Sequence, residues 1–308
     1  MRHLLSIVSL LAFVVCSDIQ INNDSTSALY LDINEFTYAN HRLYTFSGKT
    51  PYKNSEISTK KIIKSSIILV GTQYFLVKYT LGDSWWETGG QFHFEQNENY
   101  SNSIDKVGHA YVGYVLSKLN TDIFLSRGAS WEQATLYGGI VSFAQTFLTE
   151  YEDGFAMTYG FSKYDIYSNC IGILFHYLQY YVPFFQNFTP KYAYTYNRII
   201  SDTKKYNGAL IDNYEQIKLF MSINVKNMLP SKYNGMWIKG LDLVIGYGVK
   251  GFDKIDSHYL PHYLQKQYYY YGINLNLLPL LSNNGSRWNW LGQTINHIKF
   301  PSPMIEVK

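Results

Sequence analysis

Small and polar residues follow one face of a segment that is otherwise apolar. The stripe consists of Asp165, Asn169, Gly172, His176 and Gln179. These positions step by three or four, which places them on one face of an α-helix. No Asp, Glu, Lys or Arg occurs between Asp165 and Lys191. A face turned to water normally carries charged residues, so this stripe of short amides and glycine is expected to face other helices.

Two further segments repeat this pattern. Their stripes are Asp105, His109, Gly113 and Ser117, and then Thr135, Gly138, Ser142, Gln145 and Thr149. Each of the three helices is expected to start at a capping box, namely Asn102–Asp105, Ser130–Gln133 and Ser162–Asp165. Pro183 is expected to end the third helix. Small residues let helix backbones approach closely, so the pattern predicts a tightly packed bundle.

The hydrophobic period changes from helical to alternating after about residue 205. Alternation runs through Ile217–Val225, Leu241–Val249 and Ile273–Leu277, which is typical of half-buried antiparallel strands. The predicted fold class is therefore α+β. A helical bundle with a polar interior cluster is followed by a small C-terminal antiparallel sheet.

The N-terminus has the features of a secretory signal. Arg2 and His3 form a short basic start, and Leu4–Val15 forms an apolar run that is too short to span a membrane. Cleavage after Ser17 is favoured over lipidation of Cys16, because Val15 is bulky where a lipobox has Gly or Ala. We therefore expect an exported protein in the periplasm or associated with the outer membrane.

Four regions follow from these patterns. Residues 1–17 are the predicted signal peptide, 18–60 a polar leading segment, 61–200 the helical bundle domain and 201–308 the β-rich region. The first bundle helix is expected at Lys61–Tyr79. Its apolar run is interrupted by Gly71, Thr72 and Gln73, which makes it a marginal membrane span.

Composition narrows the expected partners. Aromatic residues make up 18% of the chain and charged residues only 16%, which is low for a soluble protein. Tyr and Trp favour half-wet boundaries, so a membrane or envelope lipid is the expected partner. A net charge of +3 is too small to indicate nucleic acid. Protein partners stay open, and two cysteines exclude a disulfide scaffold.

One set of polar residues could carry chemistry if the three helices pack together. The set contains Asp105, Lys106, His109, Glu150, Asp153, Asp165 and Asn169. Asp105, His109 and Asp165 could bind a divalent metal, the only cofactor considered, although none is expected. Asp105, His109, Glu150 and Asp165 are also the candidates for general acid–base catalysis.

Structural explanations compete with these roles. Asp105 and Asp165 occupy capping-box positions that favour an acid. His109 could simply hold Asp105, and Asn169 could cross-link helices. Glu150 and Asp153 belong to the segment YEDGF, for which a solvated turn is slightly favoured. Lys106 could pair with an acid or with a lipid phosphate. The sequence contains no HExxH, Gly-x-Ser-x-Gly or phosphate-loop motif.

Three motifs carry a family resemblance. They are DKVGH (105–109), EYEDG (150–154) and GFSKYDIYSNCIG (160–172). Together they resemble the YfiM-like periplasmic lipoproteins, a bacterial envelope family of uncharacterised function. More distantly, they resemble the VanZ-like membrane proteins. The resemblance covers about residues 80–180, and Ala156 departs from it where a hydroxyl residue is common. It implies an exported envelope protein and names no reaction.

Three hypotheses remain at this point. The leading one is a membrane-associated envelope protein whose polar cluster locks helices or recognises a lipid headgroup. The alternative is a metal-assisted hydrolase or transferase acting on a lipid or cell-wall substrate. The third is an integral helical membrane protein. Convergence of the polar set around an open cavity would favour the enzyme.

Overall fold

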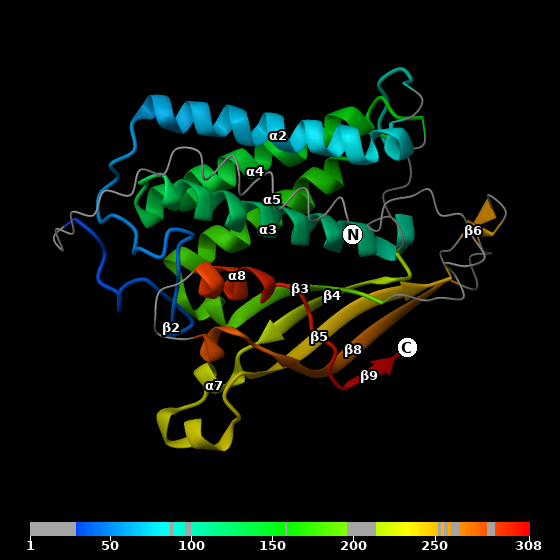
Figure 1. Cartoon of the computed structure of the whole chain (residues 1–308). Helices are drawn as coiled ribbons and strands as arrows, with labels where there is room; N and C mark the ends of the chain where they lie inside the picture. Colours follow the sequence, from blue (N-terminus) through cyan, green and yellow to red (C-terminus); the bar gives the residue numbers. More distant parts are fainter. Residues whose placement is uncertain are drawn as a thin grey trace.

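A layer of long helices lies over an antiparallel sheet in the computed structural model (Figure 1). The structure describes residues 29–86, 89–95, 100–157, 159–195, 214–251, 254–255, 258–259, 265–281 and 287–308. The predicted signal peptide and Cys16 lie outside these residues. Among the described residues, no helix has both the length and the apolar character needed to cross a membrane.

Three helices form the bundle: α3 (Ile104–Ser126), α4 (Trp131–Asp153) and α5 (Lys163–Tyr181). Helix α2 (Thr59–Trp85) packs against α4 (Figure 1). Ser130 and Ser162 cap α4 and α5 as predicted, because their side chains accept from the N–H groups of Gln133 and Asp165. The predicted cap at Asn102 is wrong. This residue lies inside the 3-10 turn η1 (Tyr100–Ser103), so α3 starts at Ile104 without a side-chain cap.

The bundle interior is polar, as the stripes predict. Asn120 on α3 donates to both Ser142 and Gln145 on α4, each at 2.8 Å. Gln145 in turn donates to the carbonyl of Leu69 on α2 at 3.1 Å. All three stripes turn inward, and most of their members are buried. The hydrogen bonds between these side chains satisfy groups that would be costly to bury alone.

Glycines bring α3 and α5 into backbone contact. A Cβ atom on Gly172 would lie 1.9 Å from the carbonyl oxygen of Ala110. A Cβ atom on Gly113 would lie 2.4 Å from the carbonyl oxygen of Asn169. No side chain larger than hydrogen fits at these two crossings, which explains why the polar stripes contain glycine.

The sheet contains β3 (Phe188–Tyr194), β4 (Ile217–Ile223), β5 (Leu241–Lys250), β8 (Lys266–Leu275) and β9 (Met304–Val307), paired antiparallel in that order. The three predicted strands correspond to β4, β5 and β8, while β3 and β9 add the two edges. On β5 the apolar residues Leu243 and Ile245 are exposed, whereas Asp242 is buried. The polar-inside arrangement therefore continues into the sheet.

Shorter elements join these layers. A hairpin of β1 (Thr37–Tyr38) and β2 (His41–Arg42) falls in the predicted polar leading segment. The 3-10 turn η2 (Pro183–Asn187) follows α5, so Pro183 lies just beyond that helix, as predicted. The remaining elements in the described part of the chain are α7 (Val225–Met228), η3 (Ser231–Met236), β6 (Lys254–Ile255), β7 (His258–Tyr259), η5 (Leu278–Leu280) and α8 (Arg287–Ile295). A small core of Ile104, Ile217, Leu219 and Val249 joins the start of α3 to the sheet.

Candidate functional site

The start of α3, the end of α4 and the start of α5 bring the predicted polar residues together. We call Asp105, Lys106, His109, Glu150, Asp165 and Asn169 the charged cluster. His109 is central to it. Its Nε2 lies 3.5 Å from Asp105 Oδ1 and 3.8 Å from Asp165 Oδ1, and its Nδ1 lies 3.3 Å from Glu150 Oε1. One imidazole therefore contacts carboxylates from three helices.

Lys106 links two of these carboxylates. Its Nζ lies 3.0 Å from Asp105 Oδ2 and 2.6 Å from Asp165 Oδ1. The Lys106 side chain is 14% exposed and the Asp165 side chain 9%, so this ion pair is largely removed from water. Pairing with an acid is one of the two alternatives predicted for Lys106, and the contact with Asp165 joins α3 to α5.

Asn169 lies beside the imidazole and is itself 1% exposed. Its Nδ2 is 3.4 Å from His109 Nδ1, while its Oδ1 has no hydrogen-bond partner. A protonated imidazole has two N–H donors and no acceptor. A half-turn of the amide would present Oδ1 to the Nδ1–H group and satisfy the buried oxygen. Asn169 thus reaches from α5 to His109 on α3, and its role as a helix cross-link stays a prediction.

The electrostatics favour a charged histidine. Burial lowers the pKa of His109, but the hydrogen bond to Asp105 and the charges of Asp105, Glu150 and Asp165 outweigh burial and raise it to about 10. Burial raises the pKa of Asp105, but His109 and Lys106 lower it by more, so the pKa of this carboxyl lies below its ordinary value. Burial raises the pKa of Glu150 well above its ordinary value. The acids around His109 therefore favour the charged form of its imidazole.

The predicted solvated turn at 150–153 is wrong for Glu150. Helix α4 continues to Asp153, which places Glu150 on its last inward-facing turn at 2% exposure. Asp153 accepts from Trp86 Nε1 at 2.6 Å. Burial raises the pKa of Asp153 to about 6, although that hydrogen bond opposes the increase. The turn signal of Asp-Gly applies only to the chain beyond the helix.

Two contacts, one to the charged cluster and one to the neighbouring Asp153, were not predicted from the sequence. Tyr214 donates to Asp105 Oδ1 at 3.0 Å from just before β4, and Trp86 binds Asp153 from just beyond α2. Neither residue belongs to a periodic stripe, so no sequence signal pointed to them. His176, the next member of the α5 stripe, lies further along α5. Its Nδ1 is 3.0 Å from Ser117 Oγ.

A divalent cation fits the donor set of the cluster. One ligand atom each from Asp105, His109 and Asp165 lies within 4.8 Å of the others, and carboxylate with imidazole suits such ions. The Lys106 ammonium contacts both of these carboxylates, so a metal would have to displace it. General acid–base catalysis by His109 would meet a similar obstacle, because both of its ring nitrogens already face acidic side chains.

Comparison with known proteins places part of the chain in context. Residues 60–181 match the model of a family described as "Predicted periplasmic lipoprotein (DUF2279)". The match covers α2 to α5 and includes every residue of the charged cluster, but less than half of the 308 residues. It supports an exported protein of an uncharacterised periplasmic lipoprotein-like family. No curated protein and no solved structure matches the chain.

Proposed function

We propose that this chain is an exported envelope protein that docks on a lipid bilayer through the outer face of its helical bundle. The outer faces of α4 and α5 carry this proposal. On α4 the exposed large apolar residues step along one face as Leu136, Ile140, Phe143, Phe147 and Tyr151. On α5 they are Tyr164, Tyr167, Ile171, Leu174, Leu178 and Tyr181. We call these eleven residues the apolar face.

The middle of the apolar face has no charge to oppose insertion. Charges lie at its ends, where Glu132 accepts from Tyr181 and Lys163 lies over the ring of Tyr164. Between Glu132 and Glu150, and again beyond Asp165, these helices contain no charged residue. Ile140, Ile171 and Leu174 are each more than half exposed. Exposed apolar patches of this extent usually mark an interaction site.

The distribution of residue types favours lipid over a protein partner. On α5, tyrosines lie at both ends of the apolar face and aliphatic residues lie between them, as at a membrane boundary. The stripe from Tyr164 to Tyr181 is about 26 Å long at 1.5 Å per residue. Helices of this kind lie in the plane of the interface with their apolar side in the acyl region. The family match to predicted periplasmic lipoproteins supports the same location.

The charged cluster has a structural role in this proposal. It holds α3, α4 and α5 together from within, because the apolar outer face cannot drive their association against lipid. His109 contacts three acids from three helices, and its charge is balanced inside the cluster. Helix locking therefore accounts for the cluster better than headgroup recognition, which would require unpaired charge. We also propose that the chain is a YfiM-like protein. Its signal peptide is then cleaved after Ser17 rather than lipidated at Cys16.

Vesicle flotation tests the docking. The purified chain without a lipid anchor should float with vesicles of zwitterionic and anionic lipid. The double variant Ile140→Glu, Leu174→Glu should float about tenfold less, since charge at the interface opposes insertion. Ile238→Glu is the matched control, because Ile238 is 70% exposed but lies outside the bundle. Equal flotation of all three proteins, or dimerisation through the apolar face without flotation, would refute the proposal.

A further inference from the structure

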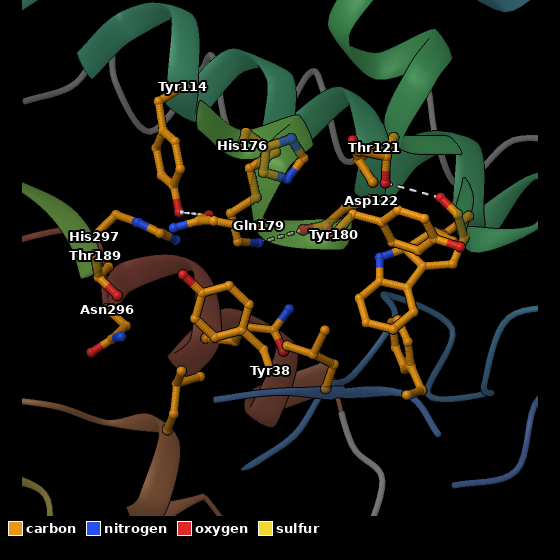
Figure 2. Close-up of a pocket in the computed structure, with 18 residues that line it drawn as sticks. Tyr38, Tyr114, Thr121, Asp122, His176, Gln179, Tyr180, Thr189, Asn296 and His297 are labelled. Carbon is orange, nitrogen blue, oxygen red and sulfur yellow. Dashed lines mark hydrogen bonds and ion pairs between the residues drawn. The ribbon is translucent and has the colours of Figure 1, made fainter. Parts of the chain in front are cut away.

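A cavity lies beyond the charged cluster, toward the C-terminal end of α3 (Figure 2). It measures about 630 Å³, counting its open mouth. Its walls come from α3, α4, α5, the β1 hairpin, β3 and the chain around α8. None of the charged-cluster residues lines it, so the two sites are separate.

The charged residues that line the cavity, Lys118 and Asp122, form an ion pair. Lys118 Nζ donates to Asp122 Oδ2 at 2.9 Å, and the two side chains are 12% and 9% exposed. Trp290 Nε1 donates to the same oxygen at 3.1 Å. Both contacts use Oδ2, so Oδ1 of Asp122 remains an acceptor, and the Lys118 ammonium has two further protons to donate.

The two histidines of the cavity are uncharged. Burial lowers the pKa of His176 to about 3, and the nearby Lys118 charge adds to the effect. Burial, Lys118 and Lys191 lower the pKa of His297 well below its ordinary value. His297 Nδ1 lies 3.3 Å from the carbonyl oxygen of Pro190, so Nδ1 carries the proton and Nε2 is an acceptor. With the ion pair balanced, the wall has no net charge.

Aromatic rings make up much of the remaining wall. Tyr114, Trp131 and Tyr180 line the cavity together with Phe36 and Tyr38. Figure 2 shows Tyr114 directed at Gln179, whose Oε1 accepts from its hydroxyl at 3.0 Å. Aromatic walls with a few placed polar groups are typical of small-molecule sites.

We propose that this cavity binds an uncharged sugar ring. Neighbouring hydroxyls of a sugar can donate to Asp122 and accept from Lys118 at the same time, while its C–H face packs on the aromatic rings. A charged ligand would unbalance the Lys118–Asp122 pair. An acyl chain would bury Oδ1 of Asp122 and the remaining N–H groups of Lys118 without offering them hydrogen bonds, which is costly.

Titration of the whole chain with a panel of ligands tests this site, with tryptophan fluorescence as the readout because Trp131 lies in the wall. The panel contains glucose, galactose, mannose and N-acetylglucosamine, with glucuronate and decanoate as charged and apolar comparisons. We expect saturable binding of at least one neutral sugar. Failure of all four neutral sugars to bind, or tighter binding of glucuronate or decanoate, would overturn the proposal.

A pair of variants localises the binding. Asp122→Asn removes the acceptor charge at nearly constant volume and should weaken sugar binding about tenfold. Glu306→Gln is the matched control, since it removes the Lys250–Glu306 pair on the sheet, whose side chains are 46% and 36% exposed. Unchanged affinity in Asp122→Asn would place any binding elsewhere and refute the site. If Asp122→Asn does not fold, the panel with the unmodified chain still decides the proposal.

Discussion

Replacement of Gly172 by alanine tests the packing on which the bundle depends. The added Cβ would lie 1.9 Å from the carbonyl oxygen of Ala110 and 2.8 Å from the backbone nitrogen of Tyr114. Even a severe contact of 3.0 Å requires the first distance to lengthen by about 1.1 Å. Both obstacles are helix backbone, so no side chain can rotate away and α3 must separate from α5.

This separation should lower the free energy of unfolding by about 3 kcal/mol, which is the upper end of the usual cost of overpacking a core. Helix propensity alone would change stability in the opposite direction by about 1 kcal/mol. The matched control is Gly71→Ala on α2, where an added Cβ meets nothing within 4 Å. That variant should be about 0.5–1 kcal/mol more stable than the unmodified chain.

Urea unfolding followed by circular dichroism measures both variants. For Gly172→Ala the expected loss corresponds to a melting temperature roughly 5 °C lower. A Gly172→Ala protein within about 0.5 kcal/mol of the unmodified chain would show that α3 and α5 do not meet at this crossing. The reasoning about close glycine contacts would then fail, and with it the basis for the charged cluster.

Three further predictions concern the charged cluster. Because the pKa of His109 is raised from 6.5 to about 10, its stabilisation is fully present below about pH 6.5 and is lost as the pH rises toward 10. Urea unfolding between pH 6 and 9 should show this decline in stability. His109→Gln should be less stable than the unmodified chain by about 3 kcal/mol at pH 6 and should lack the decline. Parallel pH profiles of the two proteins would contradict the raised pKa. Asn169→Leu should lower stability by about 1–3 kcal/mol, since it removes a buried partner of His109, and an unchanged melting curve would rule out the cross-link. Elemental analysis of the purified chain and of Asp105→Asn should give the same metal content, because Lys106 occupies the position between the carboxylates; a metal that is present and lost in the variant would favour the enzyme alternative.

The helical part of the fold follows from local patterns in the sequence. Steps of three and four predict the inward stripes, and Ser130 and Ser162 cap the helices that they were expected to start. Glu150 shows the limit of such reasoning, because Asp-Gly signals a turn but the helix continues to Asp153. Whether an acid near such a signal is buried depends on the helix that packs against it.

The sequence alone could not predict contacts between segments that lie far apart along the chain. Tyr214 lies 109 residues from Asp105 and belongs to no periodic pattern. Alternation predicted β5, yet it could not show that Asp242 faces inward while Leu243 and Ile245 are exposed. Periodicity gives the faces of an element, and tertiary packing decides which face is buried.

Depth measurement along α5 tests the membrane-docking account most directly. Single cysteines at positions 163–181 of α5, leaving out the buried positions 165, 169, 172, 173 and 179, would carry an environment-sensitive fluorophore quenched by acyl-chain labels. Cys16 and Cys170 are replaced by serine in these chains. The account predicts strong quenching at 167, 171, 174 and 178, with weak quenching at the positions between them that face α3. Uniform weak quenching along the helix, or a maximum at the half-buried positions 166 and 180, would contradict it.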